Sequence, residues 1–273
     1  MVTFDPVVLF LMGVACWLYV RAVRVLAGRG YRVGRPQQAF WWAGIALTAV
    51  GLMGPFDYYA DDLMSMHMVQ HLLIADISAP LILAGIRTPV LQFYLPRQVL
   101  VPLARRHGLR KAFRTLRAPL VAMGIYIFVL YTWHMGFAFE GALRSPFLHA
   151  LQHESFVIAS GLVWWSVVEP QRRRLRGELW KIGQIVGCRV AGMFLAMAFI
   201  IASTPLYASF YGDRPAQHGI SPLTDQQLAG GLMMAVDLGT MFFALCFFFY
   251  RSAQDHDIAE ARERDQRAAV VSG

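Results

Sequence analysis

Long apolar stretches alternate with short polar connections along the whole chain. A helix needs about 20 mainly apolar residues to cross the hydrocarbon core of a bilayer. Seven stretches reach or approach that length: 7–27, 39–56, 66–86, 118–139, 147–168, 183–204 and 227–250. The period-two alternation of barrel strands is missing from them, so helices are the remaining way to satisfy the backbone in lipid. We therefore expect an all-α fold, a bundle of seven transmembrane helices within one domain (1–251), followed by a charged tail (252–273).

Composition agrees with a membrane protein. The 273 residues are 57% hydrophobic and 15% charged, whereas soluble domains carry about 25% charged residues. The net charge of +8 is compatible with nucleic-acid binding as well. The basic residues, however, fall in connections between apolar stretches, which indicates membrane topology and contact with anionic lipids and not nucleic acid.

Arginine and lysine are distributed very unevenly between the connections. Of the 25 such residues, 22 lie near the connections 28–38, 87–117 and 169–182 or in the tail, and the alternate connections contain only Arg144 and Arg214. The positive-inside rule then places the N-terminus outside and the C-terminus in the cytoplasm. The first apolar stretch lacks a basic start and a small-residue cleavage site, so we expect a retained anchor.

Two polar segments at the basic side have helical or irregular patterns of their own. In the segment from about 97 to 117, Leu109, Phe113 and Leu116 share one helical face, and the basic residues share the other. This pattern predicts an amphipathic helix on the cytoplasmic leaflet, with lipid binding favoured over partner binding. The tail after Arg251 has mixed charges without apolar periodicity, which is typical of a frayed helix or a disordered segment.

Histidines occur in two matching pentapeptides at the starts of apolar stretches. His67-Met-Val-Gln-His71 and His149-Ala-Leu-Gln-His153 share the spacing His-x-x-Gln-His. Residues four apart lie on one helical face, so each pair points one way. With the expected topology, these four histidines and His134, near the end of its stretch, form one layer near the outer face. His218 lies in an outer connection, and we also weigh its folding over the layer with Tyr207 and Tyr211.

Acidic and amide side chains accompany this layer. Asp76 and Asp237 lie at mid-depth in their stretches, and both structural and functional roles are open, because ionisable groups in the bilayer usually face the bundle interior. Glu154 follows His153 but is one position off its face, so we expect a buried acid near the site and a weaker ligand candidate than either histidine. Gln70 and Gln152 are expected to orient imidazoles or to bond between helices. Arg189, near an inner helix end, is expected to snorkel, with contact to an acid as the alternative.

The residue types in this layer favour a metal site. Imidazole binds copper, zinc, iron and nickel, and thioether additionally suits Cu(I). Possible thioether ligands flank the first pentapeptide and the outer end of the last stretch: Met64, Met66, Met68, Met233 and Met234. Cys16, Cys188 and Cys246 are far apart with no C-x-x-C spacing, so no thiolate site or thiol redox motif is indicated.

Several of these motifs together resemble one known family, the membrane-integral CtaG-type cytochrome c oxidase assembly factors. The resemblance runs from about Trp41 to Arg251 and rests on four motifs: Met66-His67-Met68-Val69-Gln70-His71, Trp133-His134, His149-Ala150-Leu151-Gln152-His153 with Trp164-Trp165, and Asp225-Gln226-Gln227-Leu228-Ala229-Gly230-Gly231-Leu232-Met233-Met234. Met135-Gly136 and Ala235 depart from the family pattern, which often has a proline and an aromatic residue there.

The resemblance implies a multi-pass factor of the bacterial plasma membrane needed for making haem–copper oxidase, plausibly by handling copper. We thus expect copper binding by His67, His71, His149 and His153, with His134 fifth, and delivery to oxidase subunits. Two alternatives stay open, a b-haem electron-transfer protein with axial histidines and a metal-free assembly scaffold. No nucleophile–base set or phosphate loop indicates an enzyme, and the sequence leaves oligomeric state open.

Overall fold

The computed structural model describes residues 6–168 and 179–271, and within them it contains helices and no strand, which confirms the all-α class. The expected connection 169–182 lies mostly outside the described residues. The helices are α1 (Pro6–Ala27), α2 (Arg35–Met53), α3 (Pro55–Ala60), α4 (Met64–His71), the π-helix η1 (Leu72–Ser78), α5 (Ala79–Ile86), α6 (Val90–Tyr94), α7 (Arg97–Arg105), α8 (His107–Leu116), α9 (Pro119–Trp133), α10 (Gly136–Arg144), α11 (Pro146–Val168), α12 (Leu179–Ile201), α13 (Ala208–Tyr211), the 3-10 helix η2 (Arg214–His218) and α14 (Pro222–Val271).

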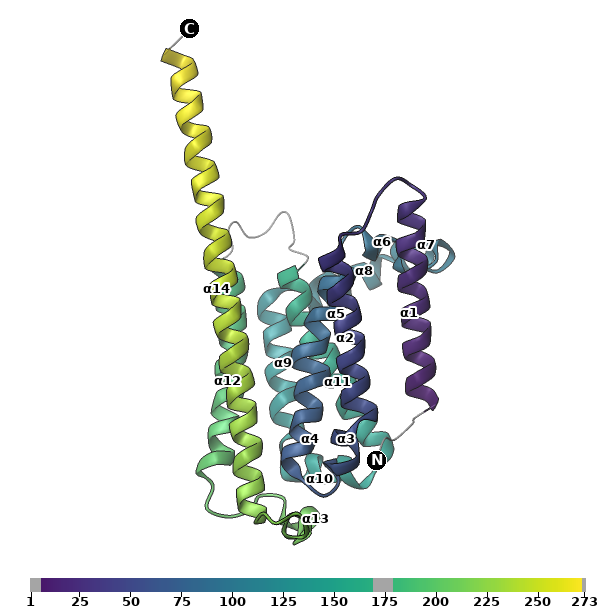
Figure 1. Ribbon diagram of the computed structural model, residues 1–273, viewed down its shortest axis with the longest axis vertical. Helices are drawn as coiled ribbons and strands as arrows, with labels where there is room; N and C mark the ends of the chain where they lie inside the picture. The colour runs from purple at the N-terminus through teal and green to yellow at the C-terminus, as the bar shows by residue number, and fades with distance from the viewer. Residues whose placement is uncertain (1–5, 169–178, 272–273) are drawn as a thin grey trace.

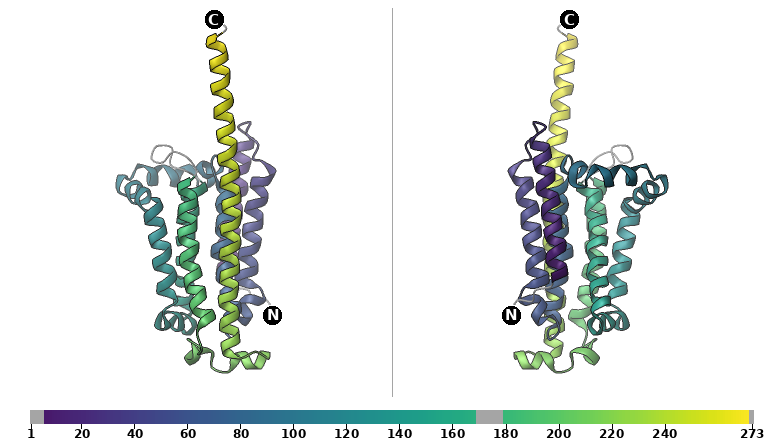
Figure 2. Two further views of the ribbon diagram at one scale, coloured as in Figure 1. Left: turned by 90° about the vertical axis from the view of Figure 1, so that its left-hand side faces the viewer. Right: turned by 90° about the vertical axis from the view of Figure 1, so that its right-hand side faces the viewer.

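The long helices run side by side, and the chain returns repeatedly from one end of the bundle to the other (Figure 1). Short helices α3, α10 and α13 lie at one end, which we call the histidine end. Helices α6, α7 and α8 lie at the opposite end, which we call the basic end (Figures 1 and 2). The segment α4–η1–α5 is central, because it contacts α2, α11 and α14.

Five helical segments of the described chain are long and apolar enough to cross a membrane: Pro6–Ala27, Arg35–Ala60, Met64–Ile86, Trp180–Ile201 and Pro222–Tyr250. A sixth is reached if α8 and α9, which meet at 73°, count as one span. These correspond to six of the seven expected stretches. The seventh, α11, has 23 residues, but its first half carries polar residues, so its span stays a prediction.

Helix α9 ends earlier than the apolar pattern predicted. The expected stretch 118–139 breaks after Trp133, where His134 and an extended Met135 separate α9 from α10. The 15 residues of α9 cover about 22 Å at 1.5 Å per residue. The break therefore places His134 at the end of a helix rather than within one.

The central segment changes its helical geometry directly after His71. Residues Leu72–Ser78 form a π-helix, a form with i→i+5 hydrogen bonds that occurs mostly as short insertions. Pro80 accounts for its position, because proline lacks an N–H and its ring clashes with the carbonyl four residues earlier, that of Asp76. The hydroxyl of Ser160 on α11 donates to the carbonyl oxygen of Ala75 at 2.6 Å, which satisfies an acceptor inside this irregular turn.

Glycines allow the central helices to approach closely. A Cβ on Gly44 would lie 2.7 Å from a side-chain carbon of Ile82 and 3.1 Å from the carbonyl oxygen of Ser78. A Cβ on Gly230 would lie 2.7 Å from the carbonyl oxygen of Ala196. These contacts hold α2 against α5 and α14 against α12.

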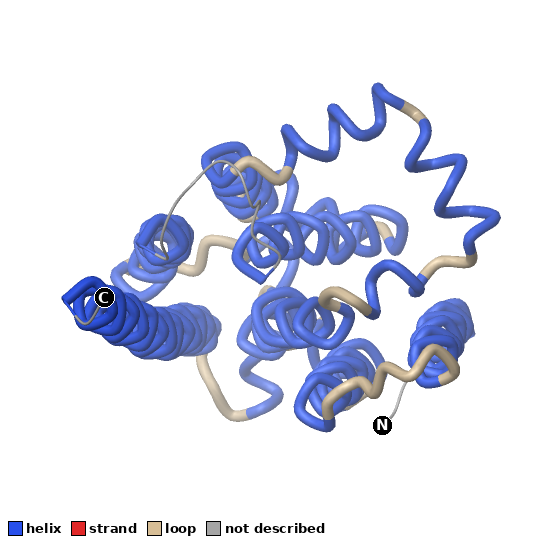
Figure 3. The backbone as a smooth tube through the Cα atoms, turned by 90° about the horizontal axis from the view of Figure 1, so that it is seen from above, coloured by secondary structure: helices blue, strands red, loops and turns tan. Residues whose placement is uncertain are grey.

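At the basic end, the segment expected as one amphipathic helix from about 97 to 117 forms two, α7 and α8, which run crosswise to the long helices at the edge of the bundle (Figures 2 and 3). Its apolar residues Leu109, Phe113 and Leu116 are exposed. Helix α14 continues without a break to Val271, so the tail that we expected to be frayed or disordered extends the last helix beyond the bundle (Figure 1).

Candidate functional site

Four imidazole rings from two helices lie against one another at the histidine end. Within α4, Nε2 of His67 and Nε2 of His71 are 2.6 Å apart. The ring of His149 on α11 stacks on His67 with centroids 5.2 Å apart, and the ring of His153 lies 4.8 Å from that of His71. The rings of His149 and His153 are 4.2 Å apart. The two pentapeptides therefore face each other across the α4–α11 contact.

His134 lies beside this group but among aromatic rings. Its ring is 5.7–6.2 Å from those of Phe139, Phe156 and Phe199. Its Nδ1 lies 2.7 Å from the carbonyl oxygen of Leu130, which accepts the hydrogen bond. In the neutral ring, Nδ1 then carries the proton, and Nε2 keeps a bare lone pair.

Five buried ring nitrogens of these histidines have no hydrogen-bond partner: Nδ1 of His67 and His71, and Nε2 of His134, His149 and His153. Buried polar atoms are nearly always hydrogen-bonded, and each exception needs an explanation. Five exceptions within one contiguous group of side chains indicate a site for a polar ligand. In the neutral His67–His71 pair one Nε2 donates to the other, so one of the two Nδ1 atoms is an N–H and the other has a lone pair that a metal ion or a proton can take.

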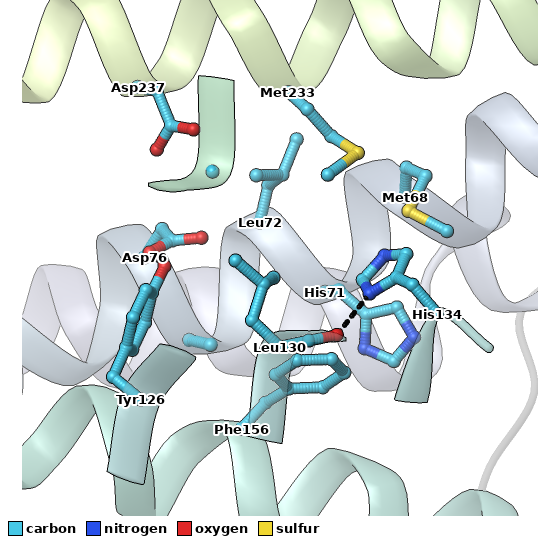
Figure 4. A pocket seen from close by; sticks show the side chains of 12 residues that line it. Met68, His71, Leu72, Asp76, Tyr126, Leu130, His134, Phe156, Met233 and Asp237 are labelled. Atoms are coloured by element: carbon cyan, nitrogen blue, oxygen red, sulfur yellow. Dashed lines mark hydrogen bonds between the residues drawn. The ribbon is translucent and has the colours of Figure 1, made fainter. Parts of the chain in front are cut away.

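A small cavity of about 30 Å³ adjoins the histidines. His71, His134, Met68 and Met233 line one part of it, and Asp76, Tyr126 and Asp237 line another (Figure 4). Its volume suffices for one or two water molecules, since one needs about 10–15 Å³.

The methionines predicted as possible ligands lie at different depths. Met64, Met68 and Met233 are buried, whereas Met66 and Met234 are partly exposed. Met68 and Met233 share the cavity with His71 and His134. Sulfur is therefore available at the edge of the imidazole group.

Arg189 joins the two acids at the other part of the cavity. Its Nη1 lies 2.6 Å from Oδ1 of Asp76 and 2.9 Å from Oδ1 of Asp237. The expectation that Arg189 snorkels is wrong: its side chain is 1% exposed, because two carboxyl groups from η1 and α14 bind it inside the bundle. The hydroxyl of Tyr126 donates to Oδ1 of Asp76 at 3.2 Å.

The remaining polar residues predicted for the site divide into buried and exposed ones. Gln70 is buried and donates from Nε2 to Oδ1 of Asp57 at 2.9 Å. Gln152, between His149 and His153 in the sequence, is buried as well, and its amide oxygen and nitrogen have no hydrogen-bond partner. Glu154 is exposed, so the expectation of a buried acid there is wrong; its position off the His149–His153 face turns it outward.

Tyr207, and not His218, contacts the histidine group from the connection between α12 and α14. The hydroxyl of Tyr207 donates to the carbonyl oxygen of His134 at 2.7 Å, and its ring stacks on Phe139 at 4.0 Å. The hydroxyl of Tyr211 donates to the carbonyl oxygen of Ala60. Burial raises the pKa of both hydroxyls above the ordinary value. His218 is exposed and lies 3.1 Å from Asp62.

Asp225 is a structural residue that the sequence did not single out for this role. Its buried carboxylate accepts hydrogen bonds from the backbone N–H groups of Met64 and Ser65, at 2.6 and 3.1 Å. Asp225 thus caps the first turn of α4 from α14, at the position that an N-cap side chain usually serves within one helix. Its neighbour Gln226 accepts from the N–H of Leu206.

The described residues contain no group of three or more His, Cys, Asp or Glu side chains already disposed to hold a metal ion. The short His67–His71 contact explains this for the central pair. Metal–nitrogen bonds of about 2.0 Å at a tetrahedral angle separate two ligand nitrogens by about 3.3 Å. Metal binding at these histidines therefore stays a prediction.

A bundle of long apolar helices with an imidazole group, thioethers and an ion triad in its interior indicates an integral membrane protein with a polar site inside its helix bundle. The family model for the cytochrome c oxidase caa3 assembly factor (Caa3_CtaG) matches residues 17–255, and the chain belongs to this family. The resemblance inferred from the sequence motifs is thereby confirmed. No curated protein and no solved structure is significantly similar to the chain.

Proposed function

We propose that this assembly factor binds copper at its histidine end and delivers it to a subunit of a haem–copper oxidase. Membership of the caa3 assembly family supports the pathway. Copper binding at the histidine end is supported by the five buried ring nitrogens that have no hydrogen-bond partner. An unsatisfied buried polar atom costs about 1–3 kcal/mol, so a group of five is retained for a ligand rather than for stability.

The four stacked histidines and His134 have the chemistry that such a ligand needs. Neutral imidazole is the metal-binding form of histidine, and the lone pair on Nε2 of His134 already points into the interior. Copper in the cluster would take the place of the His67–His71 hydrogen bond, since both Nε2 atoms cannot bind one ion at 2.6 Å. The thioether of Met68 supplies the soft ligand suited to Cu(I). Flexible thioethers also suit a site that must give its metal up.

The distribution of charge supports an orientation with the histidine end on the periplasmic side of a bacterial plasma membrane. Arginine and lysine dominate the opposite end and its connections, as the positive-inside rule requires for the cytoplasmic side. In this orientation α11 is the seventh span, and anionic lipid headgroups contact α7 and α8. The protein is not an enzyme in this proposal; it positions a metal ion for transfer.

A Cu(I) titration of the purified protein tests the proposal. We expect tight binding that is lost in the double variant His67→Ala, His153→Ala and retained in His218→Ala, whose imidazole is exposed on the outer connection. Unchanged binding in the double variant, or no binding by the parent protein, would overturn copper handling at this cluster.

The same sample distinguishes the b-haem alternative. The cavity beside the histidines measures about 30 Å³, against roughly 300–1,000 Å³ for pockets that hold drug-sized ligands, so a haem needs a large rearrangement there. A Soret band in the absorbance spectrum of the purified protein would favour haem. Pull-down of oxidase subunits without any bound metal would favour a scaffold.

A further inference from the structure

The two acids bound by Arg189 line the cavity that His71 and His134 also line, and the charges of this triad of Arg189, Asp76 and Asp237 do not balance. Two carboxylates and one guanidinium carry a net charge of −1. Arg189 and Asp237 are buried and Asp76 nearly so, with side-chain exposures of 1% for Arg189, 6% for Asp237 and 12% for Asp76. A net charge in the interior of a membrane protein is expensive, so one proton on a carboxyl group makes the triad neutral.

The hydrogen bonds indicate which carboxyl group holds that proton. Asp76 accepts from Arg189 at 2.6 Å and from Tyr126 at 3.2 Å. Asp237 accepts from Arg189 at the longer distance of 2.9 Å, and its other oxygen faces Gly192, where a Cβ would lie within 2.3 Å. Because hydrogen bonds from charged donors stabilise the ionised form, Asp76 is the carboxylate and Asp237 the acid.

The other titratable groups facing the triad do not supply the missing charge. Tyr126 approaches from α9, and Cys188 lies next to Arg189 on α12. Both are neutral in their protonated forms. From α11, the neighbour of η1 is Ser160. His71 and His134 line the same cavity as the two acids, and both are neutral in the metal-binding form. Among the described residues around the triad, Arg189 is thus the one cation facing both acids.

The cavity connects this group to the imidazoles. Its lining contains His71 and His134 together with Asp76 and Asp237, and its volume admits one or two waters. The π-helix contributes to this arrangement, because i→i+5 bonding brings Asp76 round the helix toward the side of His71, five residues earlier. A cation held by neutral imidazoles adds +1 to an interior that is otherwise neutral.

We propose that Asp237 is a proton-binding site linked to the copper site, and that it releases one proton when Cu(I) binds the histidines. The O–H bond of the Asp237 carboxyl breaks, the proton is released to solvent, and copper keeps its oxidation state. The ionised triad, with its charge of −1, then balances the bound +1. This inference rests on the proposed copper binding. It adds that the ionised triad compensates the positive charge of the bound copper ion.

Calorimetric titration of the purified protein with Cu(I), at one pH in two buffers of different ionisation enthalpy, measures the protons released. We expect release of one proton per copper ion in the parent protein. We also expect an affinity that rises by about tenfold per pH unit, as one linked proton requires. Copper binding with equal heats in both buffers would overturn the inference and leave copper handling intact; no binding in either would overturn both.

Two variants and one spectroscopic signal assign the proton to Asp237. Asp237→Asn should still bind Cu(I), more weakly, without proton release and with a flat pH dependence. Glu154→Gln, which changes an exposed acid next to His153, should behave as the parent protein. In infrared difference spectra, the carboxylic-acid band should disappear on adding Cu(I) to the parent and be missing from Asp237→Asn. Proton release that persists in Asp237→Asn, or an unchanged band in the parent, would contradict the assignment.

Discussion

Asp225 on α14 binds the backbone N–H of Met64 at a distance of 2.6 Å, although 161 positions separate the two residues. The contact fixes the first turn of α4, and His67 lies in the next. A helix that contributes no imidazole therefore determines where two of the site's imidazoles lie.

Removing this cap should loosen α4. We expect Asp225→Ala to lower the free energy of unfolding by about 1–3 kcal/mol, because two backbone donors lose their acceptor in a buried position. Copper affinity should fall with it. Thermal unfolding in detergent and Cu(I) titration measure the two effects. Asp213→Ala, an exposed acid in the outer connection, is the matched control, and equal behaviour of the two variants would contradict the role of Asp225.

Two adjacent glycines on α14, Gly230 and Gly231, allow a matched comparison of two alanine substitutions. Gly230→Ala should destabilise the protein by about 1–3 kcal/mol, as overpacking does, because the new methyl group would press on the backbone of α12 at 2.7 Å. Gly231→Ala meets nothing within 4 Å and should be neutral or slightly stabilising, since alanine favours the helix. Unfolding transitions of the two variants measured side by side decide this.

Arg189 should be more important for folding than its two partners. Arg189→Ala leaves two buried carboxyl groups without their cation, and breaking a buried pair from one side typically costs about 3–5 kcal/mol. Combining Arg189→Met with Asp76→Asn and Asp237→Asn removes all three ionisable groups and should recover most of that loss. Yield and unfolding in detergent measure it; a triple variant no better than Arg189→Ala would show that packing, not charge, makes Arg189 important.

Tyr207 should control access to His134 through its ring more than through its hydroxyl. Tyr207→Phe loses the 2.7 Å hydrogen bond to the carbonyl oxygen of His134, which costs about 1 kcal/mol, and keeps the stack on Phe139. Tyr207→Ala loses both and should release bound Cu(I) faster to a competing chelator. Equal release rates for the two variants would show that the ring does not cover the site.

Helix content and most helix positions follow from the apolar pattern, because lipid leaves the backbone few choices. The spacing of four likewise predicts that His67 and His71 face the same way. The π-helix was missed, although Pro80 is its signal: the missing N–H and the ring disturb the turn that contains Asp76. The early end of α9 has a weaker signal in the sequence than the π-helix does. Met135-Gly136 follows the last turn, but neither residue forbids a helix.

The pairing of Arg189 with two acids depends on which faces α12, η1 and α14 present to one another. Hydropathy indicates which residues lie within an apolar helix but carries little information on the rotation of that helix about its axis. The sequence alone therefore does not distinguish an arginine that snorkels from one that is buried in the bundle. The capping role of Asp225 could not be predicted for a similar reason, because the residues that it binds on α4 are far away along the chain.

The early end of α9 has an electrostatic consequence for a cation at the histidine end. The last carbonyl groups of a helix have no intrahelical partners and together carry about half a negative elementary charge. Here that charge lies beside His134, inside a bundle where water screens it poorly. If copper binds at the histidine end as proposed, we expect this helix macrodipole to favour the ion near His134, although the imidazoles themselves are uncharged.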